Sequence, residues 1–163
     1  TNTADGVVNV VPQLITGIKN VYYIKGRAGT GKSVFMKKVA AACADHGFDV
    51  ELYYCSFDPN SVDMVLVRDM DFCIFDSTDP HEFFPQKDSD IIVDLYDEFV
   101  AAGTDEKFAA EINDVHMRYK SCMKKGIHYL KEAGKKRQII EDRYMAGITD
   151  EAVARCVQSI QNI

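Results

Sequence analysis

The sequence predicts an α/β fold, with a mainly parallel sheet flanked by helices in residues 1–87 and a helical part in residues 88–163. Two observations carry this prediction. In the first half, short β-branched and aromatic runs surround an alanine-rich amphipathic run, which is typical of strand–helix–strand units. In the second half, apolar residues recur at helical spacing. A chain of 163 residues with 47% apolar and 27% charged residues is of ordinary size and composition for one globular domain, so we expect residues 1–163 to form one.

The first elements follow from local patterns. Residues 11–19, "VPQLITGIK", predict a short helix with a proline in its first turn. Residues 20–25, "NVYYIK", predict a buried strand, and residues 33–44 predict a helix. The next apolar run, residues 49–55, predicts a second strand. Because a strand–helix–strand unit is typical of parallel sheets, we expect these two strands to be parallel, with a right-handed crossover.

Two more strands are expected at residues 62–67, "VDMVLV", and 71–76, "DFCIFD". The connection between them is very short. A short connection favours a hairpin, which places one antiparallel strand in the sheet.

The second half is expected to be helical throughout. Residues 89–103, ending in a glycine, predict one helix, and Thr104 is the expected N-cap of the next. The basic run 134–138 is expected to break that helix, and Thr149 to cap a last one. The apolar positions of the two later helices are Phe108, Ile112, Val115, Tyr119, Met123, Ile127 and Leu130, and then Val153, Cys156 and Ile160.

Charge and cysteine content restrict the partners. A net charge of −6 disfavours nonspecific binding to nucleic acid or anionic lipid, and no apolar run has the length of a membrane span. Five cysteines without a CxxC pair, and no signal peptide, favour reduced thiols in a cytoplasmic protein. They are Cys43, Cys55, Cys73, Cys122 and Cys156. Because the chain starts "TNTADG" without methionine, we expect it to be part of a longer protein.

Residues 26–33, "GRAGTGKS", match the pattern G-x-x-x-x-G-K-[ST] between a predicted strand and a predicted helix. Glycines let the backbone amides approach a phosphate group closely, and the helix N-terminus adds further N–H donors. Lys32 is expected to contact the β- and γ-phosphates, and the Ser33 hydroxyl to bind Mg²⁺. The expected nucleotide contacts are Gly26, Arg27, Ala28, Gly29, Thr30, Gly31, Lys32, Ser33 and Val34.

Such a loop is paired with a carboxylate that holds the Mg²⁺ from a neighbouring strand. The run "FCIFD" ends in Asp76, which we expect to do this and to act in catalysis together with Lys32. Asp58 and Asp63 also follow or begin a strand and are alternatives, either for the metal or for a second substrate. The expected cofactors are therefore ATP and Mg²⁺.

Other charged residues have weaker assignments. Three residues near Asp76 are candidates for activating a water or an acceptor hydroxyl, namely Asp79, His81 and Glu82. The candidates for a lid over the transferred phosphoryl group are the basic residues Lys135, Lys136, Arg137 and Arg143, although basic runs are usually solvated helix faces. Structural or surface positions are expected for His46, His116 and His128, because no zinc-type spacing surrounds them.

The guanine-recognition pattern N-K-x-D, the switch pattern D-x-x-G and the dinucleotide pattern G-x-G-x-x-G are all absent from the expected places, which leaves an adenine nucleotide. Three stretches, "KGRAGTGKS", "GFDVELYYCSFDPNSVDMVLV" and "FDSTDPHEFFP", resemble an uncharacterised family of P-loop ATPases from Firmicutes. Members carry two P-loop halves in tandem. The resemblance implies a P-loop NTPase-like fold, Lys32 and Ser33 as nucleotide and Mg²⁺ contacts, and Asp76 as the Walker B acid.

The functional expectation is an ATP-binding, Mg²⁺-dependent P-loop NTPase that hydrolyses ATP. A small-molecule or nucleotide kinase, with Asp58 or Asp63 orienting the acceptor, is one alternative. A nucleotide-sensing interaction module is the other. The expected partners are the nucleotide and either a second P-loop domain or another copy of the chain.

Overall fold

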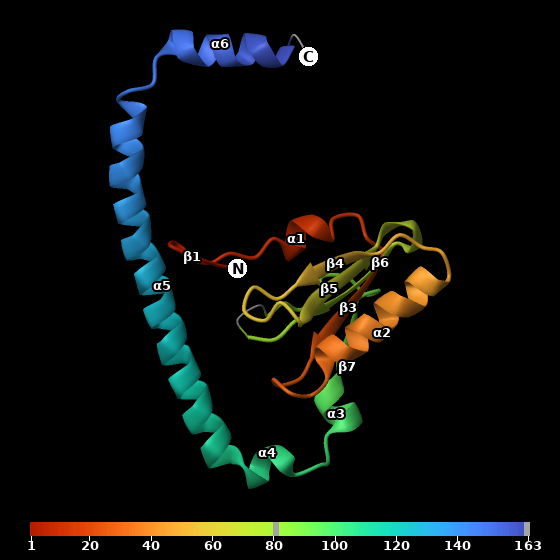
Figure 1. Ribbon diagram of the computed structural model, residues 1–163. Coiled ribbons are helices and arrows are strands. Elements are labelled where there is room, and N and C mark those ends of the chain that lie inside the picture. The colour runs from red at the N-terminus through yellow and green to blue at the C-terminus, as the bar shows by residue number, and fades with distance from the viewer. Residues whose placement is uncertain (80–81, 162–163) are drawn as a thin grey trace. The chain divides into compact units, whose positions relative to one another are not determined.

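The computed structural model describes residues 1–79 and 82–161 and contains a five-stranded sheet with strand order β4-β5-β6-β3-β7 (Figure 1). Its strands are β3 (Asn20–Lys25), β4 (Glu51–Tyr54), β5 (Val62–Val67), β6 (Phe72–Asp76) and β7 (Ile91–Asp94). The helices are α1 (Val11–Leu14), α2 (Lys32–Asp45), α3 (Leu95–Phe99), α4 (Thr104–Lys107), α5 (Ala109–Met145) and α6 (Asp150–Gln161), with a 3₁₀ turn η1 (Arg68–Met70). A separate two-stranded sheet contains β1 (Asn2–Thr3) and β2 (Gly6–Val7).

The sheet is mixed, so the prediction of a mainly parallel sheet of the P-loop NTPase kind is wrong. Strand β3 pairs in parallel with β6 and β7, whereas β5 pairs antiparallel with both β4 and β6. Short connections join β4 to β5 and β5 to β6. Connections of this kind typically link antiparallel neighbours, because parallel strands need a longer crossover. The expected parallel pairing of the two strands on either side of α2 is also wrong, because β4 lies at an edge of the sheet and does not pair with β3. The antiparallel hairpin expected between residues 62–67 and 71–76 is present.

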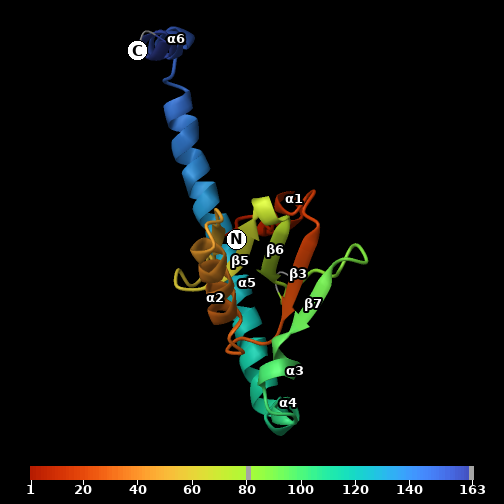
Figure 2. The same ribbon diagram turned by 90° about the vertical axis from the view of Figure 1, so that its right-hand side faces the viewer.

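The sheet is buried on both faces because its central strands are apolar at nearly every position, as expected for strands covered on two sides. Helix α2 covers one face with Met36 and Ala40, and Figure 2 shows it beside β5. On the other face, α1 and Phe83 pack against a second group of apolar residues. The buried residues of the α2 face are Ile24, Met36, Ala40, Val62, Val65, Val67, Ile74 and Leu95. Those of the opposite face are Ile18, Val21, Tyr23, Met64, Leu66, Cys73 and Phe75.

Strand β7 replaces the first part of a predicted helix. Residues 89–103 were expected to be helical, but Ile91–Asp94 pair in parallel with β3, and only Leu95–Phe99 form a helix, α3. The β-branched run "IIV" fits the pleated edge of a sheet better than a helix. Asp94 ends the strand and caps α3, because its carboxylate accepts from the amide of Tyr96 at 2.8 Å.

The later helices differ from prediction at two points. Thr104 is not an N-cap: Gly103 takes that position with φ 84°, and the Thr104 hydroxyl donates back to the Ala101 carbonyl. The basic run 134–138 does not break α5, which continues to Met145. Side-chain pairs one turn apart support the helix there, including Arg137 with Glu141. Thr149 accepts from the amide of Ala152, as expected of the residue that caps α6.

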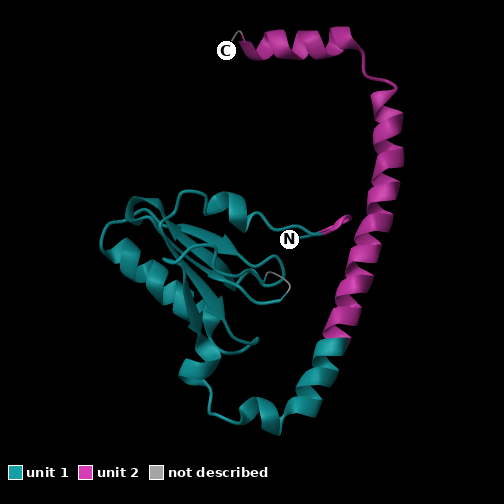
Figure 3. Cartoon of the chain, turned by 180° about the vertical axis from the view of Figure 1, so that it is seen from behind, with its two compact units in different colours: residues 1–2, 7–117 teal, residues 3–6, 118–163 magenta. Residues whose placement is uncertain are grey.

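The chain divides into two compact units, residues 1–2 with 7–117 and residues 3–6 with 118–163 (Figure 3). The first unit contains the sheet and both apolar groups. Helix α5 passes from the first unit into the second at residues 117–118. Within residues 1–79 and 82–161, no helix combines the length and the apolar character that a membrane span requires.

Candidate functional site

The segment between β3 and α2 is a glycine-rich loop whose backbone only glycine adopts easily. Gly26, Gly29 and Gly31 have φ values of 134°, 91° and 91°. A Cβ on Gly26 would lie 2.7 Å from the Thr30 hydroxyl oxygen, whereas Gly29 and Gly31 face open space. Thr30 holds the turn closed, because its hydroxyl donates to the Arg27 carbonyl at 2.8 Å. The glycines therefore allow a sharp turn that directly precedes the helix.

Most amides of this loop are free to bind an anion. The amide of Thr30 donates to the Arg27 carbonyl, but those of Ala28, Gly29 and Gly31 have no acceptor within the described part of the chain. The first turn of α2 adds N–H groups that have no partner inside the helix. Val34 lies in that turn, with its side chain 60% exposed. Free amides at a helix N-terminus favour a negatively charged group.

Lys32 is the first residue of α2, and its side chain folds back over the loop. Its ammonium donates to the carbonyls of Gly26 at 2.6 Å and Arg27 at 3.0 Å. It also lies 3.6 Å from Oδ2 of Asp76. The Lys32 side chain is only 10% exposed. The Lys32 ammonium is thus held at the loop by two neutral carbonyls and one carboxylate.

Asp76 reaches this position because β6 lies directly beside β3, with Asp76 paired to Ile24. Parallel strands end at the same edge of a sheet, so the end of β6 meets the loop that follows β3. The other carboxylate oxygen, Oδ1, accepts from both the amide and the hydroxyl of Thr78, at 3.1 Å and 2.5 Å. Thr78 therefore orients Asp76. Sequence reasoning did not single out Thr78, although "DST" after a strand is typical of such a turn.

Ser33 lies beside the loop, where its hydroxyl oxygen accepts from the amide of Val62 at 2.9 Å. One lone pair of this oxygen stays available. Mg²⁺ bound with a nucleotide takes one or two protein oxygens, phosphate oxygens and waters, so a hydroxyl and one carboxylate suffice. Ser33 and Asp76 fit that requirement. The described residues contain no cluster of three or more His, Cys, Asp or Glu side chains suited to a metal.

The other predicted acids are placed differently. Glu82 pairs with Lys25 at 3.1 Å, just before the loop, and the same ammonium donates to the Phe83 carbonyl. Asp58 accepts from the amide of Asn60 and so stabilises its own turn. Asp63 lies within β5, and Asp79 follows β6. The predicted candidate His81 lies outside the described residues.

The predicted basic lid residues belong to the second compact unit. Lys135 pairs there with Glu132, and Arg137 with Glu141, both within α5. Lys136 and Arg143 are exposed on the same helix. Of the histidines, His46 lies at the end of α2 with Nδ1 2.7 Å from the Ala42 carbonyl, and the ring of His128 lies against Tyr129.

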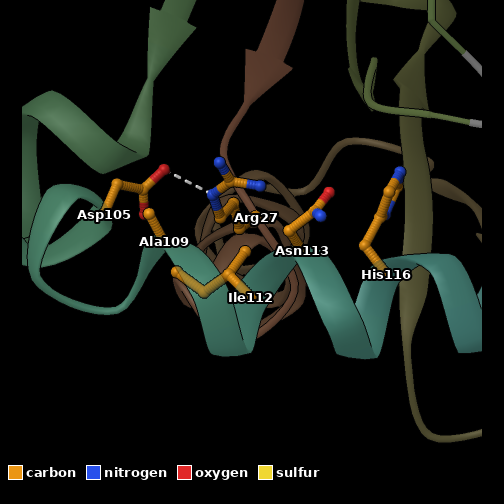
Figure 4. A pocket seen from close by; sticks show the side chains of 6 residues that line it. All are labelled: Arg27, Asp105, Ala109, Ile112, Asn113 and His116. Atoms are coloured by element: carbon orange, nitrogen blue, oxygen red, sulfur yellow. Dashed lines mark hydrogen bonds and ion pairs between the residues drawn. The ribbon is translucent and has the colours of Figure 1, made fainter.

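A cavity of about 150 Å³ adjoins the loop on the side of Arg27 (Figure 4). Arg27 donates from Nε to Asp105 at 2.5 Å, and Asp105 is held in turn because its amide donates to the Tyr96 hydroxyl. The remaining lining comes from the start of α5. These residues are Ala109, Ile112, Asn113 and His116. All of them lie in the first compact unit.

Scans against protein-family models, curated proteins and solved structures found no match to this chain. The resemblance to tandem ATPases therefore stays a prediction.

Proposed function

We propose that the chain binds ATP with Mg²⁺ at the loop formed by residues 26–33 and hydrolyses it. The observation that carries the proposal is the position of Lys32, whose ammonium lies between the loop carbonyls and Asp76. Two residues far apart in the sequence thereby supply a cation for phosphate and a carboxylate for a metal. The free amides of Ala28, Gly29 and Gly31 support the same conclusion.

The roles follow from the contacts. The loop amides and the N-terminus of α2 bind phosphate oxygens, and Lys32 turns from the carbonyls of Gly26 and Arg27 toward the β- and γ-phosphates. The Ser33 hydroxyl and the Asp76 carboxylate, which Thr78 orients, would hold the metal. When bound, Mg²⁺ neutralises charge on the phosphates. Lys32 and the metal that Asp76 would hold thus stabilise the negative charge that develops on the transferred group.

The proposal is tested by titrating the full chain with Mg-ATP and repeating the titration on Lys32→Ala. Hydrogen bonds to charged groups contribute about 1.5–3 kcal/mol, so we expect the affinity of Lys32→Ala to fall by about tenfold or more, and ATP turnover with it. Lys38→Ala is the matched control, because Lys38 is exposed on the same helix. Equal affinity and turnover in wild type and Lys32→Ala would refute the proposal.

A nucleotide-sensing module is a second candidate, favoured by one observation. Helix α5 lines the cavity beside the loop with residues 109–116 and continues without interruption into the second compact unit. A nucleotide that contacts the start of this helix therefore touches an element shared by both units. Binding without turnover, together with nucleotide-dependent association with a partner, would favour sensing over hydrolysis.

The same proposal places the protein in the cytoplasm, where Mg-ATP is present. Its partner would be a second P-loop domain or another copy of the chain, as the family resemblance implies. The net charge of −6 argues against a nucleic-acid partner.

A further inference from the structure

The cavity beside Arg27 has the composition of a site for a flat, partly polar ligand. Ala109 and Ile112 provide apolar surface, while Arg27, Asn113 and His116 provide polar groups. Small-molecule sites typically combine apolar walls with a few polar side chains that fix orientation. In Figure 4, Asn113 and His116 project from the same side of α5, toward the side on which Arg27 lies.

We propose that this cavity binds the nucleobase of the nucleotide whose phosphates occupy the loop, and that Asn113 selects adenine. The inference rests on the proposed phosphate site. Arg27 belongs to both places, as the second residue of the loop and as a wall of the cavity. A nucleotide anchored by its phosphates therefore has the cavity within the reach of the same loop.

The volume of the cavity and the planar side chains that line it suit a nucleobase. A cavity of about 150 Å³ is large enough for one aromatic ring, and this one is open, so the rest of a purine and its ribose can extend from it. Bases stack on guanidinium planes and on imidazole rings. The guanidinium of Arg27 is held at one edge by Asp105, which leaves its planar faces for such a contact.

Asn113 distinguishes adenine from guanine. Its side-chain amide has no hydrogen-bond partner within residues 1–79 and 82–161, so both its donor and its acceptor are available. Adenine presents an N6–H₂ donor next to the N7 acceptor, which one Asn side chain matches with two hydrogen bonds. Guanine presents O6 beside N7, two acceptors, and cannot make the same pair.

The most informative variant is Asn113→Asp, which keeps the shape of the side chain but leaves it with hydrogen-bond acceptors only. An aspartate repels the N7 acceptor of adenine, and it can accept from N1–H and N2–H₂ of a guanine that presents its Watson–Crick edge. Asn113→Ala removes the discrimination without reversing it. Asn9→Asp is the matched control in the same unit, because the Asn9 oxygen accepts from Val11 and an aspartate oxygen can do the same.

The experiment is calorimetric titration of the full chain and these variants with ATP, GTP and tripolyphosphate, each with Mg²⁺. We expect wild type and Asn9→Asp to favour ATP over GTP by about tenfold or more. Asn113→Asp should lower that ratio by about tenfold or more, and Asn113→Ala should bring it toward one, while the affinity for tripolyphosphate stays unchanged in Asn113→Ala and Asn9→Asp.

Two results would overturn the assignment of the cavity alone: wild type that binds tripolyphosphate but does not distinguish ATP from GTP, or an ATP-to-GTP ratio that Asn113→Asp leaves unchanged. An equal loss of ATP, GTP and tripolyphosphate binding in the neutral variant Asn113→Ala would assign Asn113 to the phosphate site instead and also overturns it. If wild type binds neither ATP nor tripolyphosphate, the phosphate site itself is absent, and the nucleobase assignment falls with it.

Discussion

The ammonium of Lys32 lies 3.6 Å from Oδ2 of Asp76, so the first residue of α2 and the last residue of β6 form an ion pair at one edge of the sheet. Without a nucleotide, each charge is the other's partner. In the proposed complex with Mg-ATP, the two charges have different tasks, since Lys32 would face phosphate and Asp76 the metal. Removing one charge therefore has different consequences with and without Mg²⁺.

Asp76→Asn should abolish the gain in ATP affinity that Mg²⁺ provides. Without Mg²⁺, ATP affinity should be unchanged or higher, because the substitution removes a negative charge near the phosphates and frees Lys32. The measurement is ATP affinity in EDTA and in Mg²⁺. Asp69→Asn, at an exposed position in η1, is the control. A wild-type Mg²⁺ dependence in Asp76→Asn would assign the metal to another residue.

Gly26→Ala should destabilise the protein more than Gly29→Ala. Both glycines have positive φ, but only the Cβ on Gly26 would come within 2.7 Å of the Thr30 hydroxyl oxygen. Backbone strain of this kind costs about 1–3 kcal/mol, and the close contact adds to it at Gly26 alone. Urea unfolding without nucleotide measures both free energies of unfolding. Equal losses for the two variants would show that Thr30 rotates away without cost.

Tyr23 should make the stability of the protein fall as the pH rises from 10 to 12. Burial, together with the neighbouring Asp90 carboxylate, raises the pKa of Tyr23 to about 12. Because the folded state holds this proton more tightly than the unfolded state, the stabilisation is complete below pH 10 and is lost as the pH rises through 12. Free energies of unfolding at several pH values measure the decrease.

Tyr23→Phe isolates that contribution. The variant loses the hydrogen bond from the Tyr23 hydroxyl to the Asp90 carboxylate, worth about 1.5–3 kcal/mol, and should show a smaller decrease between pH 10 and 12. Tyr54→Phe is the control, since Tyr54 is 56% exposed. The prediction is wrong if the two variants have the same pH dependence.

Cys73 should resist alkylation in the folded protein. Its side chain is fully buried in β6, and burial raises the pKa of the thiol to about 12, so almost no reactive thiolate forms near neutral pH. Cys122 and Cys156 are exposed and serve as internal controls. Mass spectrometry after iodoacetamide treatment should find these two labelled and Cys73 labelled only in urea. Rapid labelling of native Cys73 would show that β6 opens locally.

Local sequence patterns determined the parts of the fold whose interactions are local. The strand at 20–25, the turn glycines, helix α2 and the Thr149 cap follow from side-chain preferences within a few residues, and the structure contains all of them. The loop residues of the site belong to this group. The closeness of Asp76 also followed from a general rule, that neighbouring parallel strands end at one edge of a sheet.

Pairing and packing between segments distant in the sequence determined the remaining features of the fold and of the site. Strand β7 has the helical spacing that predicted a helix, but its β-branched run is a strand because β3 has a free edge for it to pair with. The edge position of β4 likewise depends on pairing with β5 rather than with β3, and no local pattern encodes a neighbour. The cavity beside Arg27 exists only because the start of α5 packs near the loop. The sequence alone therefore did not predict that Asn113 and Asp105 line a cavity beside it.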